Sequence, residues 1–207
     1  MLNFTVDYRV EFAFNCYLHG IAFIVLPLNL FTFYLIYAKT PKHSKNYRLY
    51  VLHIQFWTTL LDVHVSLLFM PMIVYPLVGG YCTGLLCRAG LPMHYSVVLL
   101  QFMFGGIYMS FGMSICYRHQ LILPDGHWLK MGKTTRSLVF FLAALSLQLP
   151  ALTALSAYVD SATAKQYLEA NHPAMLWLTK KGNWAVFDTS SVPVTCVLAE
   201  TAVVSCL

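Results

Sequence analysis

The sequence predicts an all-α protein, a polytopic bundle of helices that cross a lipid bilayer. Two observations predict this fold class. Four long stretches are almost entirely apolar, each interrupted by only one or two polar residues. In addition, 58% of the residues are hydrophobic, 10% are charged and the mean hydropathy is +0.64, whereas soluble domains carry roughly 25% charged residues. Too little polar surface is present to coat a water-soluble globule, so we expect the bilayer to be a direct partner of the chain.

The expected spans follow from the lengths of the apolar stretches. Each has at least the ~20 residues that an α-helix needs to cross the hydrocarbon layer. A fifth apolar run is still continuing at the last residue, so we expect an incomplete bundle within one transmembrane domain, residues 1–207. The expected spans cover residues 14–38, 49–78, 94–117, 137–159 and 191–207.

The first two spans each contain a buried polar residue. Asp62 lies about 13 residues into the second span, roughly 20 Å from its inner end at ~1.5 Å per residue. Asn29 lies at a comparable depth in the first span, and its amide is a suitable donor for the Asp62 carboxylate. An ionised carboxylate there costs on the order of 2.5–3.5 kcal/mol, so it must face the bundle interior. Two interpretations remain open: a hydrogen-bonded packing residue, and a switch or ion site.

Between the second and third spans we expect an outer loop. Gly79-Gly80 is expected to form a turn beyond the second span, after Pro71 and Pro76. Cys82 and Cys87 are the cysteines predicted to lie in an outer loop, and they are candidates for a local disulfide in an oxidising compartment.

The third span combines a stripe of small residues with a basic inner end. Gly106, Ser110 and Ser114 recur every four residues, which lets a neighbouring helix approach closely. This helix is therefore the candidate for the centre of the bundle. Arg118 and His119 follow where the helix leaves the membrane; taken alone, such basic residues often serve only as anchors.

The basic residues predict the orientation. The loops after the first and third spans hold eight of the 13 Lys and Arg residues, so the positive-inside rule places both loops in the cytosol and the N-terminus outside. The Asn3-Phe4-Thr5 sequon is a candidate glycosylation site that agrees with this orientation. The eight residues are Lys39, Lys42, Lys45, Arg48, Arg118, Lys130, Lys133 and Arg136.

Other function classes find little support in the sequence. The eight histidines form no clustered metal-binding box, so we expect no metal and no cofactor. Motifs of hydrolases and of phosphate-binding enzymes do not occur, and we expect no enzymatic activity. The net charge of +5 reflects the cytosolic loops, without the arginine and aromatic interleaving that would indicate a nucleic-acid partner.

Several short motifs together resemble the nematode serpentine chemoreceptors, class i most closely and class h next. The segment Cys116 to Gln120 is similar to the end of the third helix in those receptors. The resemblance covers about residues 15–130 well and the remainder loosely. The other motifs are Thr40-Pro41-Lys42-His43, Tyr47-Arg48-Leu49-Tyr50, Leu61-Asp62-Val63, Pro71 to Pro76, Gly80-Tyr81 and Gly84.

The resemblance implies the N-terminal portion of a rhodopsin-like, seven-helix G-protein-coupled receptor of sensory neurons, in the plasma or ciliary membrane. Arg118 would face a heterotrimeric G protein, and Asn29 with Asp62 would form a buried polar switch. Tyr117 stands where related receptors carry an acidic neighbour of that arginine, so an ionic latch on the same helix is absent. Helices six and seven are also absent, which indicates a fragment or a truncated product.

A small odorant or pheromone is then the expected ligand, bound among the outer halves of helices two, three and five. Two alternatives remain. One is a fragment of a transporter or channel that uses Asp62 as an ion or proton site. The other is a non-signalling membrane partner that associates with a full-length receptor through the Gly106, Ser110 and Ser114 stripe. Adaptable aromatic and sulfur side chains are the pocket candidates: Phe102, Met103, Tyr108 and Met109.

Overall fold

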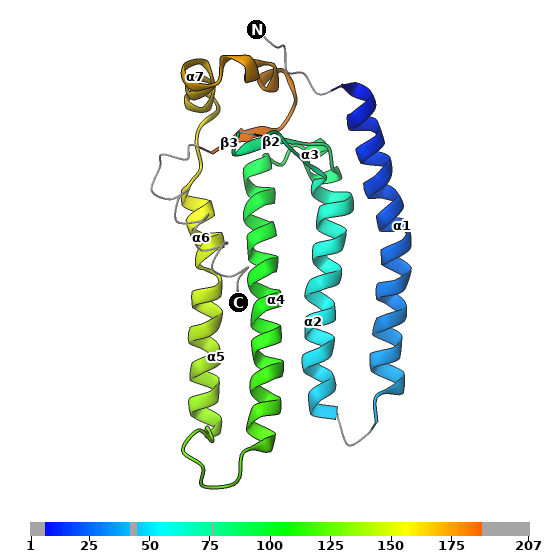
Figure 1. Ribbon diagram of the computed structural model, residues 1–207, viewed down its shortest axis with the longest axis vertical. Coiled ribbons are helices and arrows are strands. Elements are labelled where there is room, and N and C mark those ends of the chain that lie inside the picture. Colours follow the sequence, from blue (N-terminus) through cyan, green and yellow to red (C-terminus); the bar gives the residue numbers. More distant parts are fainter. Residues whose placement is uncertain (1–6, 42–44, 76, 188–207) are drawn as a thin grey trace.

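The computed structural model describes residues 7–41, 45–75 and 77–187. Long helices stand side by side, and a small sheet with short helices covers one end (Figure 1). In chain order the elements are α1 (Tyr8–Lys39), α2 (Lys45–Val63), the π-helical η2 (His64–Phe69), β1 (Pro71–Ile73), β2 (Gly79–Cys82), α3 (Leu85–Arg88), α4 (Met93–Ile122), α5 (Lys133–Leu147), α6 (Leu149–Ser156), α7 (Ser161–Asn171), the 3₁₀-helical η3 (Pro173–Lys180) and β3 (Trp184–Val186).

The predicted fold class, a polytopic helical bundle, is confirmed. Within the described residues, four helical segments are long and apolar enough to cross a membrane: Tyr8–Lys39, Tyr47–Phe69, Met93–Ile122 and Lys133–Ser156. Side chains of α1 are largely exposed, Phe23 to 83%, as expected for a helix whose surroundings are lipid rather than protein. The predicted span 191–207 lies outside the described residues.

The second span ends earlier than predicted. Residues 49–78 were expected to be one helix, but the helix stops at Phe69 and the chain then turns into strand β1. Met70 adopts a left-handed conformation with φ of 47°, and Pro71 has no backbone N–H with which to continue a helix. Val74 and Leu77 instead lie in the hydrophobic core of a cap at one end of the bundle. We call this the outer cap, because the sequence predicts that this end lies outside the cell.

The predicted turn at Gly79-Gly80 is also wrong, because both glycines lie in strand β2. This strand pairs antiparallel with β1 and with β3, and Gly80 lies opposite Ile73 and Ala185. A Cβ atom on Gly80 would collide with the carbonyl oxygen of Met72. Glycine is thus needed for close approach of two backbones, a requirement that sequence composition alone cannot distinguish from a turn.

The outer cap has its own hydrophobic core, in which α7 and η3 pack against the sheet. Tyr81, Leu168 and Leu178 are at most 1% exposed there. A disulfide joins Cys82 at the end of β2 to Cys87 in α3, with a Cα–Cα distance of 6.0 Å. The two cysteines proposed from the sequence are therefore bonded in the structure, and they fasten the sheet to the loop that leads into α4.

Helix α4 lies between α2 and the α5–α6 pair (Figure 1). Gly106, Ser110 and Ser114 are all buried, and the stripe they form is the face that α2 contacts. At Gly106 the indole ring of Trp57 fills the space that a side chain would take. The small-residue stripe is therefore used for packing within this chain.

Replacing Gly106 with Ala should destabilise the bundle, because its Cβ atom would collide with the Trp57 ring. Overpacking of this kind costs roughly 1–3 kcal/mol. Gly112→Ala is the matched control on the same helix, since a Cβ there meets nothing within 4 Å and alanine favours helix by up to about 1 kcal/mol. The midpoint of thermal unfolding in detergent measures the stability of each purified variant. Equal midpoints for the two variants would contradict the packing at Gly106.

Candidate functional site

A polar network joins α1 and α2 in the middle of the membrane. The Asn29 amide nitrogen donates to the Asp62 carboxylate over 2.8 Å. The Gln55 amide donates to the Asn29 oxygen over 2.9 Å, so Asn29 is held from both ends. The structure thus brings together the two residues selected from the sequence. Gln55 was missed, although its position seven residues before Asp62 places both on one face of a helix.

A second network joins α2 to α4. His53 Nδ1 lies 2.7 Å from the Ser110 hydroxyl, which lies 2.6 Å from the carbonyl oxygen of Gly106. The Trp57 indole N–H donates to His53 Nε2 over 3.3 Å. Because Nε2 accepts, Nδ1 must carry the proton and donate to Ser110, whose own proton goes to Gly106. A neutral histidine therefore satisfies every group in the chain of hydrogen bonds.

Arg118 lies at the end of α4 opposite the cap, the end that the sequence predicts to be the inner one, and it contacts a tyrosine of α2. Arg118 donates to the hydroxyl of Tyr47 on α2, and its guanidinium lies 4.3 Å from the centre of the Tyr47 ring. Tyr117 lies 4.9 Å from Tyr50 and 6.4 Å from Tyr47 between ring centres. Arg118 and His119 are both exposed. Aromatic and hydroxyl groups from another helix thus contact the arginine that lacks an acidic neighbour.

The loop after α4 is shaped by a buried glutamine. The Gln120 amide donates to the Leu129 carbonyl over 3.0 Å and accepts from the Met131 N–H over 2.8 Å. At the tip, Lys130 contacts Asp125 over 2.6 Å, and the hydrogen bond from Lys130 lowers the pKa of the Asp125 carboxyl. The loop that carries Lys130 and leads to Lys133 and Arg136 therefore has a defined shape beside Arg118.

At the outer end an ion pair connects α1 to the cap. Lys181 Nζ lies 2.6 Å from Glu11 Oε2, and the Tyr81 hydroxyl donates to the same carboxylate oxygen over 3.0 Å. Burial, reinforced by the hydrogen bond to Glu11, raises the pKa of Tyr81, so the phenol stays a donor. A 580 Å³ cavity lies around this ion pair, between α1 and the cap.

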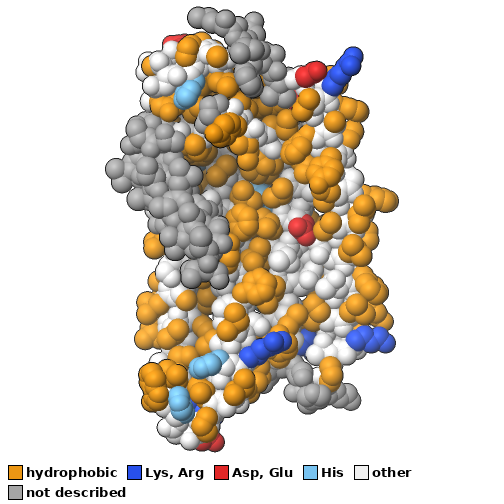
Figure 2. All heavy atoms as spheres, in the orientation of Figure 1, with side chains coloured by type: hydrophobic (Ala, Val, Ile, Leu, Met, Phe, Trp, Pro, Cys, Tyr) orange, Lys and Arg blue, Asp and Glu red, His pale blue; other side chains and the backbone are white. Residues whose placement is uncertain are grey.

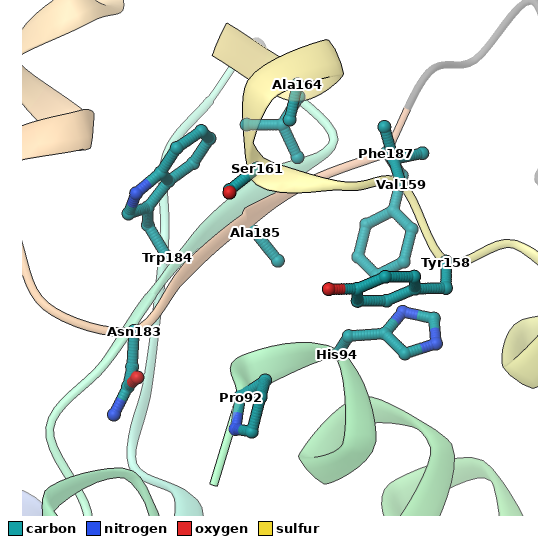
Figure 3. A pocket seen from close by; sticks show the side chains of 11 residues that line it. Pro92, His94, Tyr158, Val159, Ser161, Ala164, Asn183, Trp184, Ala185 and Phe187 are labelled. Atoms are coloured by element: carbon teal, nitrogen blue, oxygen red, sulfur yellow. The ribbon is translucent and has the colours of Figure 1, made fainter. Parts of the chain in front are cut away.

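A second outer cavity, of 240 Å³, lies where the start of α4, the α6–α7 connection and strand β3 meet (Figure 3). His94 lies at its wall and is 4% exposed. The His94 ring contacts Tyr158 at 5.2 Å and Phe187 at 5.8 Å between ring centres. The walls are formed by Pro92, His94, Tyr158, Val159, Ser161, Ala164, Asn183, Trp184, Ala185, Val186 and Phe187.

The four pocket candidates from the sequence lie elsewhere on α4. Phe102 packs edge-on against Trp57 with 5.6 Å between ring centres, Tyr108 stacks on Phe104, and Met103 is buried. Neither these three nor Met109 lines the two outer cavities. Residues 191–207, which were expected to complete their pocket, lie outside the described part of the chain, so their role stays a prediction. The Asn3 sequon also lies outside it.

Residues 11–207 match the model of a protein family described as serpentine type seven-transmembrane GPCR chemoreceptor Srh. This chain belongs to that family. It is 27% identical over 127 residues to serpentine receptor class H-72 of Caenorhabditis elegans, an alignment that covers 56% of this chain and 36% of that receptor. The chain is thus matched to little more than a third of its curated relative. No solved structure matches it.

Membership of the Srh chemoreceptors identifies the chain as a multi-pass membrane protein of a receptor family. The sequence motifs ranked class i before class h, and the matched family and relative are both of class h. In this Srh chain the two interhelical networks and the Arg118 contact each include residues of α2.

A double-mutant cycle should show that Asn29 and Asp62 stabilise each other. We expect Asn29→Ala and Asp62→Ala to be non-additive by about 0.6–2 kcal/mol, the range of hydrogen bonds between membrane helices. The control cycle uses Thr32→Ala in place of Asn29→Ala, because the Thr32 hydroxyl donates to the Leu28 carbonyl in its own helix. The effects of Thr32→Ala and Asp62→Ala on the free energy of unfolding should be additive. Unfolding of each variant in detergent gives its free energy of unfolding. Additivity of the first pair would contradict the contact.

Proposed function

We propose that this Srh chain detects a small apolar or amphipathic molecule, an odorant or pheromone, at its outer end and acts on a heterotrimeric G protein at its inner end. The observation that carries the proposal is the placement of Arg118. It is exposed at the end of α4 opposite the cap and its cavities, on a helix that also contributes His94 to the outer cavity. One rigid element thus spans both sites.

The charges support an orientation with the N-terminus outside. The inner ends of α1 and α2 and the α4–α5 loop lie at the same end of the molecule (Figure 1). Lys and Arg side chains gather at that end on the face seen in Figure 2. The positive-inside rule then assigns this end to the cytosol and the disulfide-bonded cap to the exterior. The plasma or ciliary membrane is the compartment that suits such a receptor.

Tyr47 takes the place of an acidic latch in this proposal. A carboxylate beside Arg118 would bind it through full charge, whereas a tyrosine offers one hydrogen bond and the face of its ring. An exposed cation–π contact is worth about 0.5–1 kcal/mol. Arg118 is then restrained weakly enough for a G protein to withdraw it from α2.

Two observations bear on the alternatives. Asp62 borders a 140 Å³ cavity with Leu18 and Val65, a place where a transporter would hold an ion, but the family match favours the receptor. A non-signalling partner that binds through Gly106, Ser110 and Ser114 would have to displace α2, because these three residues are already buried.

Arg118→Ala should abolish G-protein activation in a form of the receptor that includes all seven helices. The positive charge is expected to contact the G protein, so its loss removes the response and spares folding. Nucleotide exchange on the G protein measures activation, and surface labelling measures expression. Lys165→Ala, on the outer helix α7, is the control and should respond normally. An unchanged response of Arg118→Ala would contradict the role of the arginine.

Tyr47→Ala should raise basal signalling of the same receptor by about two- to fivefold, because it releases Arg118 at a cost of roughly 0.5–1 kcal/mol. Tyr47→Phe keeps the ring and should give a smaller rise. Tyr50→Phe is the control, since the Tyr50 ring packs on Tyr117 and, among the described residues, does not contact Arg118. Basal nucleotide exchange is the measurement. Unchanged basal activity in Tyr47→Ala would show that the contact does not restrain Arg118.

A further inference from the structure

The outer cavity beneath β3 has walls without formal charge. None of its eleven lining residues is Asp, Glu, Lys or Arg. In the part of the chain that the structure describes, Asp160 precedes the lining residue Ser161, and its side chain caps α7 by accepting from the Ala162 N–H over 3.3 Å. His94 is 4% exposed, and the burial of an unpaired charge at such a site is costly.

Neutral polar groups in this cavity are left without partners. The Tyr158 side chain is exposed, and its hydroxyl points into the cavity (Figure 3) without a hydrogen bond to the residues that the structure describes. His94 Nε2 is buried and likewise unpaired within the described part of the chain. A buried polar atom without a partner costs roughly 1–3 kcal/mol. A hydrogen-bonding ligand would recover some of this free energy, while Phe187 and Trp184 provide apolar surface.

The cavity beside α1 differs in its electrostatics. Its walls contain Glu11, Lys181 and Arg88, and the Glu11–Lys181 pair leaves the Arg88 charge in excess. Of the two outer cavities, this one therefore offers an anion a positive charge among its described lining residues, whereas the lining of the cavity beneath β3 offers none.

We infer that the cavity lined by His94, Tyr158 and Trp184 binds uncharged small molecules that carry a hydroxyl group and rejects ionised ones. This inference rests on the proposed function as a chemoreceptor. An ionised ligand would lose hydration and gain no counter-charge from the eleven described lining residues, whereas an alcohol pairs with Tyr158 and buries its hydrocarbon against the rings. The volume of 240 Å³ equals that of about eight waters at ~30 Å³ each, which suits a ligand of roughly ten non-hydrogen atoms.

The test compares three probes of similar size that differ in charge: 2-phenylethanol, phenylacetate and 2-phenylethylammonium. Binding to the full chain in lipid nanodiscs at neutral pH is measured by calorimetry, with empty nanodiscs subtracted. We expect saturable binding of the alcohol, at least tenfold tighter than that of either ion. Tyr158→Phe should weaken alcohol binding by about five- to tenfold, since it removes the hydroxyl and keeps the ring.

Tyr95→Phe is the matched control. The Tyr95 ring stacks on Tyr158 at 6.3 Å but does not line the cavity, so alcohol binding should be unchanged. Ala185→Leu narrows the cavity from β3 and should also weaken binding. Three results would each overturn the inference. They are no saturable binding of the alcohol, binding of either ion as tight as that of the alcohol, and an alcohol affinity that Tyr158→Phe leaves unchanged. If the alcohol does not bind but Arg118-dependent activation of the G protein persists, the inference fails and the proposed receptor function stands. If the alcohol binds but the G protein is not activated, the proposed receptor function fails.

Discussion

Hydrocarbon offers no hydrogen-bond partners, and this constraint governs the interior of the bundle. A polar side chain that helices α1, α2 and α4 bury in the hydrocarbon region is costly unless it finds a partner within the protein. Asn29 meets this requirement by contacting Asp62 and Gln55 together, and His53 meets it through Ser110 and Trp57. Each network has members on two helices, so the same hydrogen bonds that satisfy polar groups also fix which helices are neighbours. Polar residues here specify the packing that the hydrophobic effect cannot specify in lipid.

Helix α4 connects the two ends of the protein. His94 near its start and Arg118 near its end are separated by 24 residues, which is ~36 Å along a helix and exceeds the hydrocarbon thickness of ~30 Å. A ligand beside His94 and a G protein beside Arg118 would therefore touch one continuous element. Between them, Gly106 and Ser110 hold α4 against α2, so a displacement of α4 would strain the contact with Trp57 and the hydrogen bond to His53. Such a contact favours a small number of discrete arrangements over continuous movement.

The sequence was informative where structure follows from local composition. Apolar length predicts the helices, and the cost of burying charge predicts that Asp62 needs a partner such as Asn29. The end of the second helix at Phe69 could not be predicted in this way, because residues 70–78 are as apolar as a membrane span. Val74 and Leu77 of this stretch enter the cap core with Leu168 and Leu178, residues almost a hundred positions away. The outer cavity was missed for the same reason, since its walls come from α4, the α6–α7 connection and β3.

The two ends of the bundle hold their charged side chains by contacts of different strength. Glu11 and Lys181 form a direct ion pair, with the Tyr81 hydroxyl on the same carboxylate, and this joins α1 firmly to a cap that the Cys82–Cys87 disulfide already restrains. Arg118 instead meets an uncharged tyrosine. A partly buried ion pair with an added hydrogen bond resists separation more than an exposed cation–π contact does. The cap end of the bundle is thereby held together more firmly than the contact between Arg118 and Tyr47 at the opposite end.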